Sequence, residues 1–180
     1  FCFFLVFAAL LIYLPFRLSE LSSNADEFRI GLAYSGYLMG IAVSMNAVRI
    51  HRLSGGPEKV MVAALAFFII ALLVMLVPQV WALVGGMFIL CGASFLTHAT
   101  ATGCLNQHLT QSKGVINGLY VAFYYGGGAI GSYLPGYVYR DFGWNGFILL
   151  LCSVLLIALF LAVHLSRLTG LSSTHNVSAG

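Results

Sequence analysis

The sequence predicts an all-α polytopic membrane protein in which six transmembrane helices form an inverted repeat of three plus three. Its composition is the first reason: hydrophobic residues make up 61% of the chain and charged residues only 7%, whereas soluble domains carry about 25% charged residues. The second reason is a mean hydropathy of +0.98. The third is a pattern of polar residues that recurs every third apolar stretch. Together these observations favour a helical bundle embedded in a lipid bilayer.

Six apolar stretches follow one another along the chain, and short polar connections separate them. A spanning helix needs roughly 20 mainly apolar residues. The six stretches meet or approach that length, so residues 1–166 are predicted to form one bundle and 167–180 a short polar cytoplasmic tail. The predicted spans cover residues 1–18, 29–48, 60–77, 81–104, 114–138 and 144–163.

The first three spans differ in polarity. The first is short and has Pro15 near its far end, where a proline ends or kinks a helix. The second carries Gly36 and Gly40 four residues apart, a small-residue face that allows close helix packing. The third contains no polar side chain, which indicates a helix in contact with lipid.

The last three spans repeat this order. The fourth carries His98 on a stripe of Ser and Thr at four-residue steps, which share one face of a helix. The fifth combines several tyrosines with Gly127 and Gly131, a GxxxG pair for helix packing. The sixth is almost wholly aliphatic. Trp81 and Trp144 open the fourth and sixth spans, and we expect them to anchor at the membrane surface.

The polarity therefore recurs with a period of three spans. Spans two and five are rich in glycine and tyrosine, three and six resemble lipid-facing helices, and one and four carry polar groups in their second halves. With three spans per unit, the second unit must be inverted relative to the first. Inverted repeats of this kind are typical of transporters, whose units form a cavity near the middle of the membrane.

The basic residues are distributed unevenly between the two sides of the predicted bundle. Cytoplasmic loops carry an excess of Lys and Arg, so the richer side and both ends of the chain are predicted to be cytoplasmic. The acidic residues agree, because only Glu58 falls on the richer side. That side holds Arg49, Arg52, Lys59, Lys113 and Arg167, and the other holds Arg17, Arg29 and Arg140 with Glu20, Asp26, Glu27 and Asp141.

Several classes of function are not indicated. No run of Lys or Arg could grip nucleic acid, and no phosphate-binding loop is present. The four cysteines lie within or at the edge of apolar stretches without C-x-x-C spacing, so we expect neither a disulfide framework nor a metal site. No H-E-x-x-H or G-x-S-x-G motif points to an enzyme. We expect no cofactor.

Several polar side chains inside the spans are candidates for a substrate cavity. Tyrosine offers a ring for stacking and a hydroxyl for orientation. The alternative is that such residues only contact a neighbouring helix, or anchor at the membrane surface as expected for Tyr133, Tyr137 and Tyr139. The cavity candidates are Tyr34, Tyr37, His98, Asn117, Tyr120 and Tyr124.

His98 is a candidate for proton coupling. Apart from tyrosines and cysteines it is the only titratable side chain well inside a predicted span, and intramembrane ionisable groups are functional candidates by default. A histidine, with an ordinary pKa of about 6.5, can gain and lose a proton near neutral pH. The alternative is a hydrogen bond to a neighbouring helix. All five acidic residues are expected in loops, so any membrane carboxylate would lie elsewhere.

Part of the sequence resembles a known family. The resembling residues are Lys113-Gly114, Asn117-Gly118-Leu119-Tyr120, Tyr124-Tyr125-Gly126-Gly127, Ile130-Gly131, Gly136 and Gly143-Trp144-Asn145-Gly146. They look like the end of a major facilitator superfamily transporter, close to its YnfM-like bacterial efflux branch. The resemblance covers the whole chain as helices seven to twelve and is most specific from about Gly92 to Gly146.

The resemblance implies a function that the spans alone do not name. It implies the C-terminal half of a secondary active transporter, an antiporter of drug- or sugar-efflux type in the bacterial inner membrane. An N-terminal six-helix half of the same transporter would complete the path for a small-molecule substrate and protons. Spans one, two, four and five would line the cavity. Because the chain starts with Phe1 rather than Met, we expect it to be a piece of something longer.

Two alternatives remain open at this point. The chain can instead be a truncated, non-transporting membrane protein, a remnant or a scaffold of six helices. The loop after span two also departs from the family pattern, because it keeps Arg49 and Arg52 without the aspartate of a G-x-x-x-D-R-x-G-R signature. Those two arginines are therefore expected to fix the topology, with a role in a cytoplasmic gate as the minority interpretation.

Overall fold

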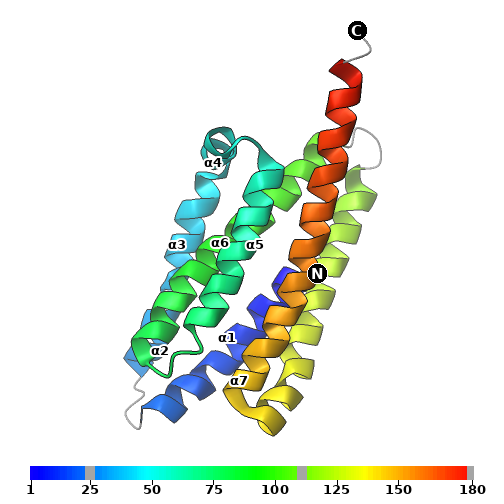
Figure 1. Ribbon diagram of the computed structural model, residues 1–180. Helices are drawn as coiled ribbons and strands as arrows, with labels where there is room; N and C mark the ends of the chain where they lie inside the picture. Colours follow the sequence, from blue (N-terminus) through cyan, green and yellow to red (C-terminus); the bar gives the residue numbers. More distant parts are fainter. Residues whose placement is uncertain (23–26, 109–112, 178–180) are drawn as a thin grey trace.

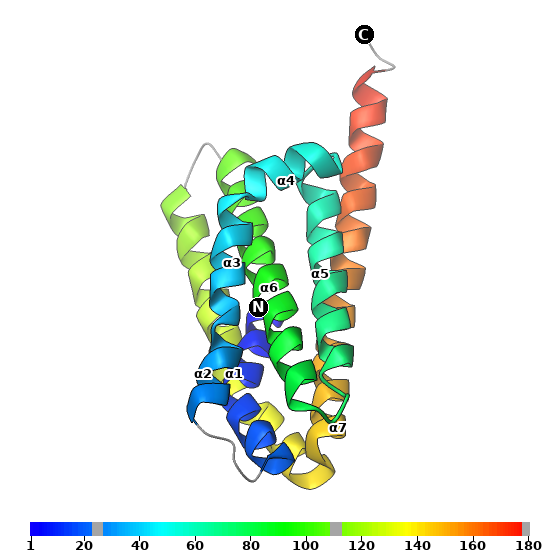
Figure 2. The same ribbon diagram turned by 90° about the vertical axis from the view of Figure 1, so that its left-hand side faces the viewer.

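The computed structural model describes residues 1–22, 27–108 and 113–177, and all regular structure within these ranges is α-helical. The predicted all-α class is confirmed. Most helices run side by side in a bundle, and one short helix lies across its end (Figures 1 and 2). The helices are α1 (Cys2–Leu21), α2 (Glu27–Tyr34), α3 (Gly36–Met45), α4 (Ala47–Ser54), α5 (Pro57–Val74), α6 (Val80–His108) and α7 (Lys113–Val177).

Helix α7 consists of two arms that run in opposite directions (Figure 1). The first arm covers residues 113–142 and the second 144–177. They meet at Gly143, whose φ of 66° and ψ of −169° are not helical. Only glycine adopts this backbone conformation readily, so the chain turns here without a loop.

The helices are suited to crossing a membrane. Helices α1, α5, α6 and α7 are each long and apolar enough to span it, and the apolar part of α7 covers both arms. A shorter apolar stretch, Ile30–Met45, covers most of α2 and α3. With α2–α4 taken as one broken segment and α7 as two arms, the described residues form six segments. The chain is a multi-pass membrane protein.

The second predicted span, 29–48, is broken at Ser35 and Asn46. Ser35 Oγ donates a 2.6 Å hydrogen bond to the carbonyl oxygen of Leu32, and Asn46 Nδ2 donates a 2.9 Å bond to that of Ala42. Such side-chain bonds compete with the helical ladder and bend helices. Asn46 leaves helical geometry, with φ −96° and ψ 6°.

Beyond Asn46 the chain stays helical as α4, which crosses the end of the bundle (Figure 2). The predicted span, 29–48, ends within the first turn of α4. A helix lying along a membrane surface needs only one apolar face, so loss of hydrophobicity marks the end of a span but not the end of a helix. Gly55, at φ 80°, ends α4 in the left-handed conformation that glycine favours. Pro57 then opens α5, as expected for a proline at the first helical position.

Two other boundaries also differ from the prediction. The tail expected at 167–180 continues the second arm of α7 as a helix to Val177. Helices α1 and α6 extend to Leu21 and His108, into stretches expected as connections. In each case polar residues continue a helix because the backbone ladder does not require apolar side chains. The remaining parts of those connections and of the tail, 23–26 with Asp26, 109–112 and 178–180, lie outside the described residues.

The core forms around α1, which contributes fully buried Leu10 and Leu14. Phe68 of α5, Met87 of α6 and Phe147 from the second arm of α7 are also fully buried in this core. Helix α5 and the second arm keep an exposed apolar face that includes residues 67, 70, 156 and 160. Contact of spans three and six with lipid stays a prediction.

Two close helix contacts involve the glycine pairs. A Cβ on Gly127 or Gly131 in the first arm of α7 would collide with the backbone of α1 at Phe1 or Leu5. A Cβ on Gly36 of α3 would lie 3.0 Å from the carbonyl oxygen of Met87 in α6. Each glycine-rich segment thus packs on the first helix of the other three-helix unit. This reciprocal arrangement is the one an inverted repeat produces.

The bundle has two unlike ends. The α4 end holds α4, the last turns of α6 and the C-terminal part of α7, whereas the Gly143 end holds the last turn of α1, the α5–α6 turn and Gly143 (Figure 1). Among the described side chains, Arg49, Arg52, Lys59 and Arg167 belong to elements at the α4 end. The side chains of Arg29 and Lys113 lie outside that description.

Candidate functional site

A polar contact inside the bundle joins α6 to the first arm of α7. The hydroxyl oxygen of Tyr120 lies 2.9 Å from Nδ1 of His98, within hydrogen-bond distance. The hydroxyl donates when Nδ1 carries no proton and accepts when Nδ1 is protonated. The two side chains, both half-buried, can therefore stay in contact while the histidine gains or loses a proton.

Aromatic rings surround this contact. Tyr124 lies one turn after Tyr120, and the centroid of its ring is 5.1 Å from that of His98. The ring of Phe4 in α1 stacks on Tyr124 with centroids 3.7 Å apart, and the Phe3 ring lies 6.2 Å from His98. We call Phe3, Phe4, His98, Tyr120 and Tyr124 the His98 cluster. It brings together three of the six predicted cavity residues, from α6 and the first arm of α7.

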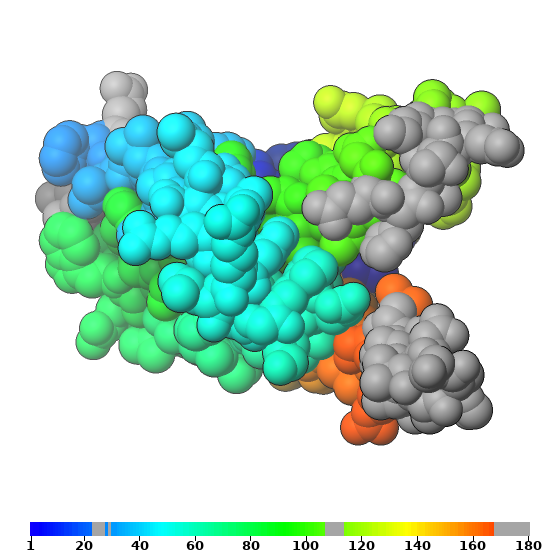
Figure 3. All heavy atoms as spheres, turned by 90° about the horizontal axis from the view of Figure 1, so that it is seen from above, coloured from blue at the N-terminus to red at the C-terminus, as the bar shows by residue number. Residues whose placement is uncertain are grey.

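The His98 cluster comes from elements that border a hollow in the surface. Seen from the α4 end, the molecule is hollowed between the α2–α4 segment and the first arm of α7, with α1 at the bottom (Figure 3). Phe3 and Phe4 lie in the first turn of α1. The cluster thus combines stacking faces with a hydroxyl and an imidazole, groups that can bind a ring-containing molecule.

Two predicted cavity residues instead hold helices together. The hydroxyl of Tyr34 donates a 2.6 Å hydrogen bond to the carbonyl oxygen of Leu11 in α1. The ring of Tyr37 packs edge-on against Phe7 and Phe95, with centroids 5.7 and 5.6 Å away. Both tyrosines are half-buried in these contacts. Their geometry fits the alternative that such tyrosines contact a neighbouring helix.

The remaining predicted residues lie nearer the α4 end. Asn117 is exposed, and its Nδ2 lies 3.4 Å from Oδ1 of Asn106 in α6. Arg49 and Arg52 are exposed on α4. Neither arginine has a hydrogen-bond or ion-pair partner within the part of the chain that the structure describes. None of these three residues belongs to the His98 cluster.

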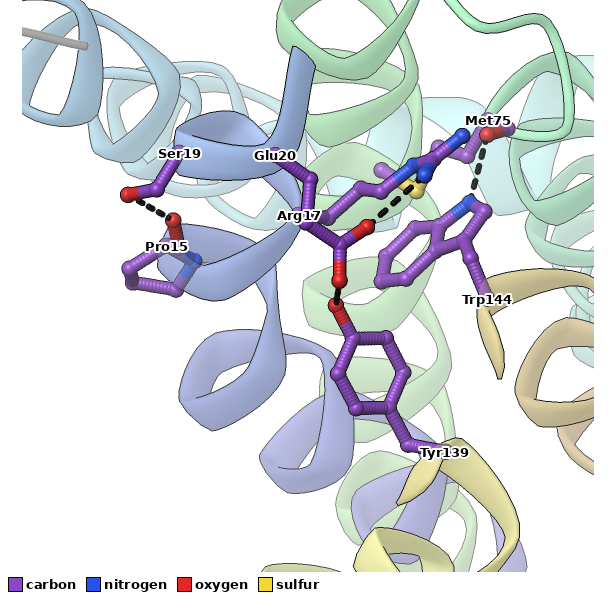
Figure 4. Close-up of polar contacts among 7 residues, drawn as sticks. All are labelled: Pro15, Arg17, Ser19, Glu20, Met75, Tyr139 and Trp144. Carbon is purple, nitrogen blue, oxygen red and sulfur yellow. Dashed lines mark hydrogen bonds and ion pairs between the residues drawn. The ribbon is translucent and has the colours of Figure 1, made fainter. Parts of the chain in front are cut away.

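A second polar network lies at the Gly143 end (Figure 4). Arg17 forms a 2.8 Å ion pair with Glu20, and Glu20 accepts a hydrogen bond from the hydroxyl of Tyr139. The Arg17 guanidinium lies 5.8 Å from the ring centroid of Trp144, in range of a cation–π contact. Nε1 of Trp144 donates a 2.8 Å hydrogen bond to the carbonyl oxygen of Met75. The network links α1, both arms of α7 and the residue that follows α5.

Comparison with known proteins decides the family. The sequence profile of the Major Facilitator Superfamily matches residues 1–177, almost the whole chain. The chain belongs to the Major Facilitator Superfamily. The resemblance that the residues suggest is thereby confirmed.

This facilitator chain also resembles a named protein of the same kind. It is 32% identical over 73 residues to the inner membrane transport protein YnfM of Escherichia coli (strain K12). The match covers 41% of this chain and 18% of YnfM, so it spans well under two thirds of that protein's length. No solved structure matches the chain.

The network at the Gly143 end corrects two expectations about this facilitator chain. Glu20 was expected in a loop, but it lies in the last turn of α1. Trp144 was expected at the membrane surface, but it is only 4% exposed, because its ring packs against Tyr139 and Phe147. Trp81, by contrast, is 71% exposed. The sequence did contain one signal for the network, since Arg17 and Glu20 are three residues apart and face each other on a helix.

Sequence reasoning also missed a histidine on α4. Nε2 of His51 lies 2.9 Å from the hydroxyl of Thr100, which is fully buried on α6. This contact attaches α4 to the core of the bundle. In the described part of the chain, no three His, Cys, Asp or Glu side chains gather closely enough to hold a metal ion.

Proposed function

We propose that this chain is the C-terminal six-helix half of a secondary active transporter. It would move a small organic solute across the bacterial inner membrane by alternating access, coupled to protons. The proposal is supported by family membership over residues 1–177 and by the likeness to a protein named as an inner membrane transport protein. The observation that carries it is the His98 cluster, because polar side chains inside a membrane are costly and mark transport paths.

The His98 cluster is the part of this half that meets the substrate in the proposal. Tyr124 and Phe4 offer flat faces for a ring, and the Tyr120 hydroxyl orients a polar substituent. The substrate is accordingly a small solute with a ring, of drug or sugar type. The N-terminal six-helix half covers the hollow and supplies the opposite wall of the cavity.

His98 takes part in proton coupling in this proposal. When the imidazole is neutral with its proton on Nε2, the Tyr120 hydroxyl donates to Nδ1, and when the imidazole is charged the hydroxyl accepts. A change of protonation therefore reorients the hydroxyl that faces the solute. Glu20, the carboxylate in α1, is tied to Arg17 and Tyr139 at the Gly143 end. A membrane carboxylate that carries the main proton flow is accordingly assigned to the N-terminal half.

The orientation in the membrane forms part of the proposal. The described cations of the α4 end are Arg49, Arg52, Lys59 and Arg167, against Arg17 and Arg140 at the Gly143 end. By the positive-inside rule the α4 end faces the cytoplasm. The C-terminal end of this chain is then cytoplasmic, and the Arg17–Glu20–Tyr139 network lies on the outer side. The first residue was expected at the cytoplasmic end as well, but it lies about halfway along the bundle (Figure 1).

The first test is the intact mass of the native polypeptide, together with its N-terminal sequence. A mass about twice the 19.4 kDa of these 180 residues, with further apolar segments before Phe1, is the expected result. A native mass near 19.4 kDa would favour a six-helix protein that does not transport, a remnant or a scaffold.

The second test is transport by the full-length protein in inside-out membrane vesicles, measured over a panel of drugs and sugars with and without a proton gradient. The expected result is gradient-dependent movement of one solute class, with coupling lost in His98→Ala. Full coupling in a folded His98→Ala variant would exclude His98 as a proton carrier. Movement that ignores the gradient would exclude proton coupling altogether.

A further inference from the structure

An apolar groove lies on a different face of the molecule from the hollow beside the His98 cluster. It encloses about 440 Å³ between α3, α5 and α6, beneath α4. Its walls include Met39 and Val43 of α3 and Phe67 of α5, and its floor includes Gly92 of α6. Figure 2 looks onto this side, with α3 and α5 flanking α6 and α4 across the upper end.

Small residues explain why the groove exists. Residues 63, 64 and 93 are alanines and residue 92 is glycine, and all four line it. The side chains nearest to Gly92 belong to Met39 and Val43, 3.5 and 3.7 Å from where a Cβ would stand. Helices α3 and α5 thus stand apart over α6, where Gly92 and Ala93 lie between the larger side chains of Phe88, Ile89 and Leu96. The resulting slot has the apolar lining of a site for a hydrocarbon chain.

The end of the groove beneath α4 is basic. Ser54 and Val60 both line it, and the ammonium of Lys59 folds back over Gly55 between them, 3.2 Å from where a Cβ on Gly55 would stand. Arg49 and Arg52 lie on α4 on either side of the lining residue Ile50, but neither arginine lines the groove itself. Both arginines are exposed.

The described charges around this end favour an anion. Three cations, Arg49, Arg52 and Lys59, stand against the carboxylate of Glu58. Within the described residues, these three cations form no ion pair with Glu58 or with any other acidic side chain. A hydrocarbon slot that ends at unpaired cations is complementary to a lipid with an acidic headgroup.

We propose that this groove binds an anionic phospholipid, with one acyl chain in the slot and the phosphate beside Lys59 at its mouth, where the charges of Arg49 and Arg52 on α4 also attract it. Basic pockets between membrane helices on the cytoplasmic side bind such headgroups. Because bilayer tails are as apolar as the groove, the slot positions the lipid and the cations select its charge. The bound lipid joins α4 to α5 and so fixes the angle at Asn46.

The test uses the full-length protein that contains this chain, purified in detergent. Native mass spectrometry measures binding of dioleoyl-phosphatidylglycerol and, separately, dioleoyl-phosphatidylcholine. Wild type is expected to bind the anionic lipid more tightly. Arg49→Gln, Arg52→Gln and Lys59→Gln are each expected to weaken that binding roughly fivefold, since one cation near a membrane surface contributes about 1 kcal/mol.

Two further variants separate the groove from charge in general. Ala63→Leu fills the slot from an exposed position on α5 and is expected to weaken binding of the anionic lipid without any change in charge. Arg167→Gln removes an exposed cation from the same end of the bundle but away from the groove, and is expected to leave binding unchanged. Thermal unfolding without added lipid verifies that each variant is folded.

Four results would overturn the proposal. Equal affinity for the two lipids would remove the role of the cations, and an equal loss in Arg167→Gln would make the effect non-specific. Unchanged binding in Ala63→Leu would show that the slot is not occupied. A complex of two protein copies that Ala63→Leu dissociates would assign the groove to a protein interface instead. None of these measurements involves transport, so their outcome does not test the proposed transport function.

Discussion

Helix α3 and the first arm of α7 occupy equivalent places in the inverted repeat but use their polar residues differently. Both approach a helix of the other unit through glycines four residues apart. Beside that contact, Tyr34 and Tyr37 of the α2–α3 segment are engaged in packing against α1 and α6. Tyr120 and Tyr124 of the first arm instead gather around His98. A repeated packing face thus carries two different sets of polar groups.

Small-residue spacing and intramembrane polarity therefore report different properties of the chain. Glycine spacing reports where two backbones meet, and it gives a similar answer in both units. A tyrosine indicates function only when its hydroxyl is not already hydrogen-bonded to a backbone carbonyl. The hydroxyl of Tyr34 is bonded in this way, to the carbonyl oxygen of Leu11. Matched substitutions on the two segments test this difference.

Gly131→Leu is expected to have the largest effect. Its Cβ would meet the backbone of Leu5, so α1 itself would have to move. Overpacking costs about 1–3 kcal/mol and more when the backbone must shift, so we expect a loss of at least about 3 kcal/mol in thermal unfolding of the detergent-purified full-length protein. The control is Gly126→Leu, where a Cβ meets nothing within 4 Å. An equal loss in both variants would refute the close contact.

Gly36→Ala tests the corresponding contact of α3. Glycine to alanine in a helix normally stabilises by about 0.5–1 kcal/mol, and Gly31→Ala should show this gain because its Cβ meets nothing within 4 Å. At Gly36 the new methyl lies 3.0 Å from the carbonyl oxygen of Met87, so we expect a loss of about 1 kcal/mol in the same unfolding measurement. Similar gains at both positions would mean that α3 and α6 are not in close contact.

Tyr34→Phe removes the hydroxyl that bonds to Leu11. Hydrogen bonds between membrane helices contribute about 0.6 kcal/mol on average and up to about 1.7. We expect a loss of stability in that range, with solute transport retained once the protein is folded. Impaired transport without loss of stability would instead place Tyr34 in the substrate path.

Tyr120→Phe is the matched change on the other segment and is expected to have the smallest effect on stability, below about 0.5 kcal/mol. Its effect should appear in transport, as a several-fold change in the rate or in the half-saturating solute concentration. The measurement uses the solute found for the full-length protein in inside-out vesicles. Unchanged transport in a folded variant would show that Tyr120 does not contribute to the path.

Much of the architecture could be predicted because membrane helices obey simple rules. Apolar length locates the spans, and the steps from Gly36 to Gly40 and from Gly127 to Gly131 locate close contacts, since both features act locally along the chain. The boundaries of α4 and α7 could not be predicted in this way. Their helices continue through polar residues, and hydropathy alone says nothing about helical backbone structure.

The site could be predicted only in part. His98, Tyr120 and Tyr124 stand out as polar residues in apolar spans, so their residue types reveal them. The network of Arg17, Glu20, Tyr139 and Trp144 could not be predicted, because 119 residues separate Glu20 from Tyr139 and only the fold brings them together. Whether a tyrosine serves packing or a cavity likewise depends on which backbone carbonyl lies within its reach, as Leu11 does for Tyr34.

The single-residue turn at Gly143 also bears on how the chain enters a membrane. With no loop between its arms, α7 can be inserted only as a hairpin, so its more polar first arm enters together with its more apolar second arm. The polar groups of the first arm raise its cost of insertion, and the aliphatic second arm offsets that cost. The tip carries Arg140 and Asp141 as a 2.8 Å ion pair, so this pair adds no net charge to the tip of the hairpin.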